Sequence, residues 1–147
     1  MNKAEFWIAR PTHYWMMNSP FDPSFSYGKT YESAGLDGLL LFDTQNLAPE
    51  VYVSLTAVAK ETTTLKLGTG VTNPRTRHAA VTASAMATLN AVSLGRAYLG
   101  VGRGDSALAH IGYVPTGVAE FEKYVEQLGA YLRGDEVMFP MDSDIKT

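Results

Sequence analysis

The sequence predicts an α/β fold in which parallel strands alternate with helices. Four short apolar runs recur about thirty residues apart, with helical patterns between them. The runs do not alternate strictly between apolar and polar residues, as expected for strands that are covered on both faces. A strand-helix repeat of this length is typical of βα units in a parallel sheet.

Each element can be placed from its local pattern. The expected strands are residues 5–9 (EFWIA), 38–42 (GLLLF), 64–71 (TLKLGTGV) and 97–101 (AYLGV). The expected helices are residues 25–34, 49–62, 79–92 and 118–132. The last helix is the clearest, because apolar residues recur in it at steps of three and four. We expect Thr116 to cap this helix and Gly134 to end it.

Two architectures fit these elements. The 147 residues suit either a small doubly wound sheet or the first half of an eight-unit barrel, which needs roughly 250 residues. A doubly wound nucleotide-binding domain carries a glycine fingerprint after its first strand. Here that place reads ARPTHYWMM, without glycine. The missing fingerprint argues against a dinucleotide-binding fold, while the spacing alone fits both architectures.

Composition excludes several functions. The formal charge is −3, from 12 basic and 15 acidic residues, and no basic tract indicates nucleic-acid binding. The chain has no cysteine, so disulfides, thiolate metal sites and cysteine nucleophiles are excluded. The three histidines, His13, His78 and His110, lack the spacing of metal ligands. Without an apolar run long enough for a signal peptide or a membrane span, we expect a cytoplasmic protein with no membrane partner.

Polar and glycine-rich loops follow each expected strand. The first loop carries Thr12, His13 and Trp15, and the second begins with Asp43. The third is GTGVTNPRTRH, residues 68–78, and the fourth is GRGDS, residues 102–106. In a parallel α/β fold these loops gather at the carboxyl ends of the strands. We therefore expect Asp43, Thr72, Asn73 and Arg103 on one face of the molecule.

The residues in these loops have alternative interpretations. The glycines could let a flat ligand approach the backbone, or could serve tight turns and bends. Asp43 needs hydrogen-bond partners, which could be a ligand or its own loop. Asp105 is expected as a helix N-cap. Arg75, Arg77 and His78 could attract an anion, but the favoured interpretation is that they are solvated loop charges that pair with acidic neighbours.

Several separated motifs resemble one protein family. The segment LGTGVTNPRTRHAAVTASAMATLN, followed by GRAYLGVGRGDSALAHIG, is similar to the luciferase-like monooxygenase superfamily. DTQNLAPEVYVSL extends the resemblance, which is dense over residues 35–132. Its nearest branch is the flavin- or coenzyme F420-dependent oxidoreductases related to methylenetetrahydromethanopterin reductase.

The resemblance implies a fold and a cofactor site. The fold is a (β/α)₈ barrel that binds FMN or a deazaflavin (coenzyme F420) at the carboxyl ends of its strands. The third strand carries a non-prolyl cis peptide bond in this family, and the matching bond here joins Gly70 to Val71. The expected cofactor-binding residues are Asp43, Gly70, Val71, Thr72, Gly102, Arg103 and Gly104. Asp43 is also the candidate catalytic residue, and no metal is implied.

Members of the family are longer than this chain, so the resemblance implies a single, incomplete domain over residues 1–147 with about four βα units. The implied function is hydride transfer or oxygen activation on a small organic substrate. A non-catalytic flavin-binding or interaction protein is the alternative, and an unrelated doubly wound domain is a weaker one. Open sheet edges are templates for pairing, so we expect a homo-oligomer or a complementary half-barrel partner.

Overall fold

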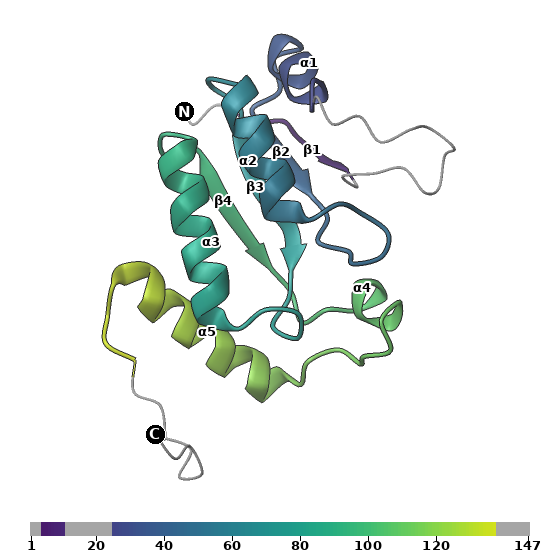
Figure 1. Ribbon diagram of the computed structural model, residues 1–147, viewed down its shortest axis with the longest axis vertical. Coiled ribbons are helices and arrows are strands. Elements are labelled where there is room, and N and C mark those ends of the chain that lie inside the picture. Colours follow the sequence, from purple (N-terminus) through teal and green to yellow (C-terminus); the bar gives the residue numbers. More distant parts are fainter. Residues whose placement is uncertain (1–3, 11–24, 138–147) are drawn as a thin grey trace.

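The computed structural model describes residues 4–10 and 25–137. The elements follow the chain in the order β1 (Trp7–Arg10), α1 (Tyr27–Ser33), β2 (Gly38–Leu41), α2 (Val51–Glu61), β3 (Lys66–Thr72), α3 (Ala79–Val92), β4 (Ala97–Val101), α4 (Ser106–Ala109) and α5 (Val118–Arg133). Strands and helices alternate as predicted (Figure 1). The four strands and the four longer helices begin and end within two residues of their expected bounds.

The strands form one parallel sheet in the order β1-β2-β3-β4, so each strand pairs with the next one along the chain. α2 and α3 lie side by side against one face of this sheet (Figure 1). Apolar residues of α1, α2, α3 and the strands form a single core there. Its fully shielded side chains are Leu39, Leu41, Val51, Leu55, Val58, Leu65, Leu67 and Leu89. A doubly wound sheet has helices on both faces, so that alternative is wrong and the arrangement is that of a barrel wall.

The opposite face of the sheet combines large side chains with glycines. Trp7 on β1 lies across Gly38 on β2, where a β-carbon would overlap the indole ring. Gly68 on β3 leaves room in the same way, because a β-carbon there would lie 2.6 Å from the carbonyl oxygen of Tyr98 on β4. The Trp7 and Tyr98 rings meet edge to face with centroids 5.0 Å apart. Side chains of the two outer strands therefore touch across the two inner strands.

α5 packs mainly on α3. Ala79 and Ala83 of α3 form a second apolar cluster with Tyr124 and Leu128 of α5. The Tyr124 hydroxyl shares a hydrogen bond of 2.7 Å with the hydroxyl of Thr82. Burial raises the pKa of Tyr124, so its hydroxyl stays neutral.

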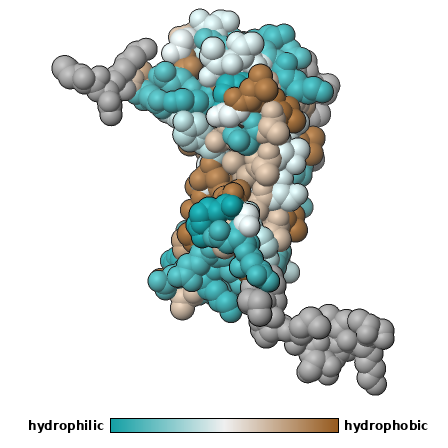
Figure 2. Space-filling model, turned by 90° about the vertical axis from the view of Figure 1, so that its left-hand side faces the viewer, coloured by the Kyte–Doolittle hydropathy of each residue, from teal (hydrophilic) through white to brown (hydrophobic). Residues whose placement is uncertain are grey.

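An apolar surface follows the junction of α3, β4 and α5. Figure 2 shows hydrophobic side chains in the middle of the side that carries α3, between hydrophilic ends. A cavity of about 400 Å³ opens at this junction, and Met86, Leu99 and Leu132 contribute to its lining. Within residues 4–10 and 25–137, no further strand lies beyond β1 or β4.

One of three predicted helix ends differs from the expectation. Gly117, not Thr116, is the N-cap residue of α5, and the buried Thr116 hydroxyl has no hydrogen-bond partner. The expectation that Thr116 caps α5 is therefore wrong: its backbone N–H instead donates to the carbonyl of Arg103 at 2.9 Å. Asp105 occupies the N-cap position of α4 as predicted, but its side chain makes no capping hydrogen bond. Gly134 ends α5 in the left-handed conformation, as predicted.

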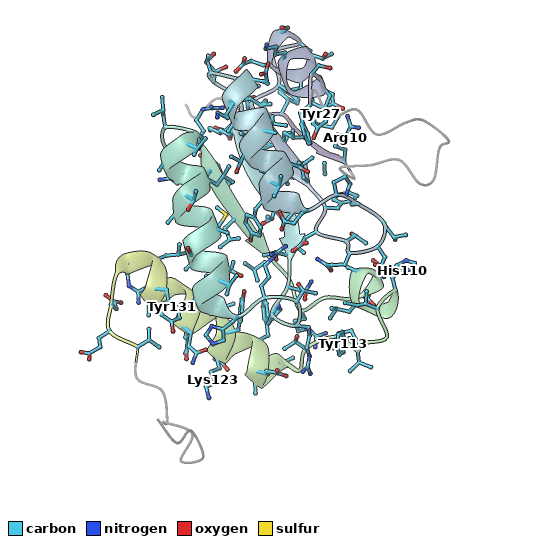
Figure 3. The ribbon with its side chains drawn as sticks, in the orientation of Figure 1. Arg10, Tyr27, His110, Tyr113, Lys123 and Tyr131 are labelled. Atoms are coloured by element: carbon cyan, nitrogen blue, oxygen red, sulfur yellow. The ribbon has the colours of Figure 1, made fainter. Side chains whose placement is uncertain are left out.

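The side chain of Arg10, the last residue of β1, contacts α1. The Arg10 guanidinium lies 4.2 Å from the centre of the Tyr27 ring and donates to the Tyr31 hydroxyl at 2.9 Å. Figure 3 shows Arg10 and Tyr27 next to each other at the end of α1. Such a cation over an aromatic face is favourable by about 0.5–1 kcal/mol at an exposed site.

Two opposite charges hold the loop between α2 and β3. Through one carboxylate oxygen, Glu32 accepts hydrogen bonds of 2.6–3.0 Å from the backbone N–H groups of residues 63–65. The Arg96 guanidinium donates to the backbone carbonyl oxygens of Ala59, Thr62 and Leu65 around this loop. It also donates to the carbonyl oxygen of Ser93, just after α3. The loop thus has an anion at its donors and a cation at its acceptors.

Glu32→Gln is expected to destabilise the protein at neutral pH and much less in acid. Burial alone would raise the pKa of Glu32, but hydrogen bonds from Thr64, Leu65 and Thr63 outweigh it and lower the pKa from 4.5 to about 2. A carboxylate with a lowered folded pKa stabilises above its unfolded pKa and loses that contribution as the pH falls through the folded value. We expect a loss of about 1–2 kcal/mol at pH 7, allowing for partial exposure.

Urea unfolding near pH 7 and near pH 2.5 measures this difference. The exposed Glu126→Gln on α5 is the control and should change little at either pH. An equal loss from Glu32→Gln at both pH values would contradict the assigned role of the Glu32 charge.

Candidate functional site

A cavity of about 510 Å³ lies at the carboxyl ends of β2, β3 and β4. Asp43 lines it from the loop after β2, Gly70 and Val71 from β3, and residues 102–107 from the loop and short helix after β4. Of the seven predicted site residues, six line this cavity, and Thr72 does not. The parallel sheet therefore gathers most of the predicted candidates at one edge.

Asp43 is a buried carboxylate in the wall of this cavity. Its side chain is 2 % exposed. One oxygen, Oδ2, accepts a hydrogen bond of 2.6 Å from the Thr72 hydroxyl, and the other, Oδ1, accepts one of 2.6 Å from the Gln45 amide. Thr72 is fully buried. It supports Asp43 from within the protein and does not reach the cavity surface.

Arg77 lies beside the same Asp43 oxygen that accepts the Thr72 hydroxyl. Its Nε is 3.6 Å from Asp43 Oδ2, and its Nη2 forms an ion pair with Glu50. The guanidinium carbon lies 4.9 Å from the centre of the Tyr52 ring. Burial alone would lower the pKa of Arg77, but the charges of Asp43 and Glu50 outweigh it and raise the pKa. Burial also raises the pKa of Tyr52 to about 12, so an uncharged ring faces the guanidinium.

β3 bulges beside the cavity. The register of β3 against β4 shifts between Thr69 and Thr72, and the bond between Gly70 and Val71 is cis, as the resemblance implied. Thr69 replaces the ladder bonds lost at the bulge: its hydroxyl donates to the Gly100 carbonyl at 2.8 Å and accepts from the Gly100 N–H at 3.1 Å. The bulge is thus supported without leaving the Gly100 backbone unpaired.

Val71 turns out of β3 at the bulge and lies over β4. A β-carbon at Gly100 or Gly102 would lie 3.1 or 2.8 Å from its methyl groups. Val71 remains 47 % exposed and presents an apolar surface to the cavity. Gly104 has φ +79°, which favours glycine. The spacing of these glycines is therefore explained by the bulge and the turn, and it also leaves a low cavity floor.

The Asn73-Pro74 pair turns the chain from β3 towards α3. The Asn73 side-chain oxygen accepts hydrogen bonds from the backbone N–H groups of Arg75 and Thr76, at 3.1 and 3.2 Å. This is an Asx turn, in which the side chain replaces a backbone acceptor. The Asn73 side chain is thus needed for the loop itself.

The two arginines of this loop have acidic partners, as the favoured interpretation predicted, whereas His78 accepts a hydrogen bond from the backbone. Arg75 pairs with Glu120 of α5 at 3.2 Å, and Arg77 pairs with Glu50. His78 is the N-cap residue of α3, where its Nδ1 accepts from the backbone N–H of residue 80 at 3.2 Å. Arg77 is nevertheless only partly solvated, since its side chain is 19 % exposed.

The loop after β4 supplies the opposite wall of the cavity. Arg103 is exposed, and its Nη1 donates to the carbonyl of Thr116 at 3.3 Å. His110 and Tyr113 lie beyond this wall, beside α4 (Figure 3). In the described part of the chain, no group of three or more His, Cys, Asp or Glu side chains could hold a metal ion.

Some predicted residues lie outside the described part of the chain, and some residues beside Asp43 were not predicted. Residues 12, 13 and 15, expected in the first loop, lie outside the described residues. Sequence reasoning missed Gln45 and Tyr52 and treated Arg77 as a surface charge. The charges of Glu50 and Arg77 offered a usable signal, because the first lies in the loop after β2 and the second in the loop after β3. Loops after successive strands are neighbours in a parallel sheet, so this ion pair could have been predicted. No helix in the described ranges is long and apolar enough to span a bilayer.

Sequence comparison identifies relatives. The profile of the luciferase-like monooxygenase family matches residues 9–142. The 5,10-methylenetetrahydromethanopterin reductase of Methanolobus tindarius is 47 % identical over 91 residues, which is 60 % of this chain and 28 % of the relative. The F420-dependent glucose-6-phosphate dehydrogenase of Kineococcus radiotolerans is 39 % identical over 83 residues, or 51 % of this chain and 25 % of the relative. The matched part is thus about a quarter of these relatives' length.

Comparison with solved structures identifies proteins that contain a similar sheet. The coenzyme F420 dependent tetrahydromethanopterin reductase from Methanopyrus kandleri matches with a TM-score of 0.77 and 28 % identity, over 95 % of this chain and 43 % of that chain. The oxygenating constituent of 3,6-diketocamphane monooxygenase from Pseudomonas putida, solved with FMN, matches with a TM-score of 0.65 and 21 % identity, over 86 % and 38 %. At that identity the second likeness concerns the fold alone. The parallel sheet is part of a luciferase-like barrel, and the chain belongs to the luciferase-like monooxygenase family.

Proposed function

We propose that the chain binds the ring system of coenzyme F420 or FMN in the 510 Å³ cavity and forms part of an oxidoreductase site for a small organic substrate. The cavity floor carries this proposal: the exposed apolar surface of Val71 is flanked by glycine backbone, with Asp43 and Arg103 in the walls. Small-molecule sites are mostly apolar, have a few placed polar groups and measure roughly 300–1,000 Å³. The residues present fit a flat aromatic ring.

Coenzyme F420 is the first candidate for the cofactor. Relatives whose names specify this coenzyme are 39 % and 28 % identical to the chain. The relative solved with FMN is 21 % identical and supports only the fold. Sequence likeness therefore favours the deazaflavin, and FMN is the alternative.

In this proposal the cofactor carries out the reaction, and the protein binds and orients the cofactor and the substrate. A bound deazaflavin supplies hydride transfer, and a bound flavin supplies hydride transfer or oxygen activation. In this proposal Val71 packs against the ring and Arg103 contributes positive charge at the rim. Asp43 accepts a hydrogen bond or a proton from the ring edge or the substrate, because each of its oxygens keeps a free lone pair beside its bond to Thr72 or Gln45.

The proposed site needs more protein than the described sheet. β1 and β4 are its two outer strands, and unpaired strand edges favour association. The solved relative from Methanopyrus kandleri is more than twice as long as the part that this chain matches. We therefore propose that a second copy or a complementary half-barrel supplies further strands, and with them the remainder of the substrate site.

One experiment tests binding and association together. Light scattering coupled to chromatography measures the mass of the native species, and an absorbance scan and fluorescence titration with F420 and FMN measure binding. We expect an assembly larger than one chain that binds F420 more tightly than FMN. A monomer that binds neither cofactor would contradict the proposal. Binding without turnover by the assembly would favour the non-catalytic alternative.

Asp43→Asn is expected to weaken binding of the preferred cofactor about 10- to 100-fold, since a hydrogen bond to a charged group contributes about 1.5–3 kcal/mol. Asp135→Asn is the control, because Asp135 pairs with Arg133 after α5 and lies away from the cavity. Fluorescence titration of both variants measures the effect. Equal affinity in Asp43→Asn and wild type would contradict a role for the Asp43 charge in binding.

A further inference from the structure

Arg77 and Thr72 both lie beside the same oxygen of Asp43, Oδ2. Glu50 fixes the outer part of the guanidinium, and Glu50 is itself fixed: its Oε2 accepts from the backbone N–H of Val53 at 2.7 Å as the N-cap of α2. Its other oxygen pairs with Arg77. The Tyr52 ring, from the same turn of α2, packs against the guanidinium. Two contacts from one helix end therefore prevent the Arg77 side chain from turning away.

The inner part of the guanidinium faces Asp43. The Arg77 Nε is buried and has no hydrogen-bond partner. It lies 3.6 Å from Asp43 Oδ2, which is the oxygen that already accepts the Thr72 hydroxyl. This separation is too long for a hydrogen bond but short enough for a strong charge interaction in a poorly solvated site.

Asp43 also lines a second cavity. A smaller cavity of about 210 Å³ lies between the loop after β2 and the start of α2, and Asp43, Gln45, Glu50 and Arg77 line it. Asp43 therefore lines both this cavity and the 510 Å³ cavity. A carboxylate between two cavities keeps one orientation only if its neighbours favour that orientation.

We infer that Arg77 is a positioning residue, which acts with Thr72 to hold the Asp43 carboxylate in the orientation that serves the larger cavity. This inference rests on the proposed function, because the use of that orientation is to bind the cofactor or substrate. Arg77 itself does not line the larger cavity. Its effect on a ligand there must pass through Asp43.

A double-mutant cycle on cofactor binding tests this dependence. The variants are Arg77→Met, Asp43→Asn and the double variant, titrated with F420 and with FMN. We expect Arg77→Met to weaken binding of the preferred cofactor about tenfold in the wild-type background and less than about twofold in the Asp43→Asn background. Arg77→Lys should recover part of the loss, because it restores the positive charge.

Arg75→Met is the matched control. Arg75 lies in the same loop but pairs with Glu120, so its replacement should change the affinity less than about twofold. Equal losses from Arg77→Met in both backgrounds would mean that Arg77 acts independently of Asp43, and would overturn the inference. No loss in either background would overturn it as well.

A second cycle separates this inference from the proposed function. If the wild-type assembly binds neither cofactor, the proposed function fails, and the same variants are compared by thermal unfolding. Melting-temperature losses that are clearly non-additive would retain the Arg77–Asp43 coupling. Additive losses would overturn it.

Discussion

Arg96→Met is expected to destabilise the protein by about 3–4 kcal/mol, which corresponds to a melting temperature about 10 °C lower or more. The Arg96 guanidinium donates to four backbone carbonyls at 2.6–3.0 Å, three of them between the last turn of α2 and the start of β3 and one just after α3. Ala59, Thr62, Leu65 and Ser93, which carry these carbonyls, are buried. Methionine fills similar space but donates nothing, so each carbonyl loses a partner that water cannot readily replace.

Thermal and urea unfolding of Arg96→Met measure this loss. The control is Arg133→Met, because Arg133 is 65 % exposed and pairs with Asp135 near the end of α5. Exposed ion pairs contribute about 0–1 kcal/mol, so this control should melt close to wild type. Similar melting temperatures for the two variants would show that the carbonyl contacts of Arg96 do not stabilise the fold.

Gly100→Ala is expected to cost about 3 kcal/mol or more and to disturb the cavity. A β-carbon at Gly100 would overlap the carbonyl oxygen of Thr69 and press on Val71. Both contacts lie at the bulge, where Thr69 also bonds the Gly100 backbone. Relief of the overlap requires β3 and β4 to separate, which would break those bonds and displace Val71.

Gly129→Ala is the matched glycine control. Gly129 lies inside α5, and a β-carbon there would meet only the end of the flexible Arg133 side chain, at 3.1 Å. Alanine is a better helix former than glycine, so this variant should gain about 0.5–1 kcal/mol. Calorimetry of the two variants gives the comparison. A melting temperature for Gly100→Ala equal to wild type would contradict the close approach of β3 and β4.

Most of the fold could be predicted because its signals are local. Apolar runs and glycine stops define elements such as α3 and β4 without knowledge of their neighbours. Thr116 shows where local signals fail: its sequence position suits a cap, but a long-range backbone bond to Arg103 buries it. The face that α5 covers could not be predicted either, because its apolar stripe does not specify whether it packs on α3 or on the sheet.

The position of the candidate site could be predicted, but the contacts that support its residues could not. Strand ends meet at one edge in any parallel sheet, so Asp43, Asn73 and Arg103 could be grouped before their geometry was known. The position of Thr72 beneath Asp43 depends on the bulge, and the bulge depends on glycines in β4. The burial of Arg77 depends on the fixed end of α2. Such relations involve three elements at once, and sequence spacing does not reveal them.

The strand order has a consequence for the folding kinetics. Each strand pairs with the one that precedes it in the chain, at a sequence separation of about thirty residues. Closing a loop of that length costs about 3 kcal/mol of chain entropy, beyond a constant, and the cost is nearly the same at every step. Folding is faster when contacting residues are close in sequence. The sheet can therefore grow one βα unit at a time, even while a nascent chain is still emerging, and its growth does not wait for the outer edge of β1 to find a partner.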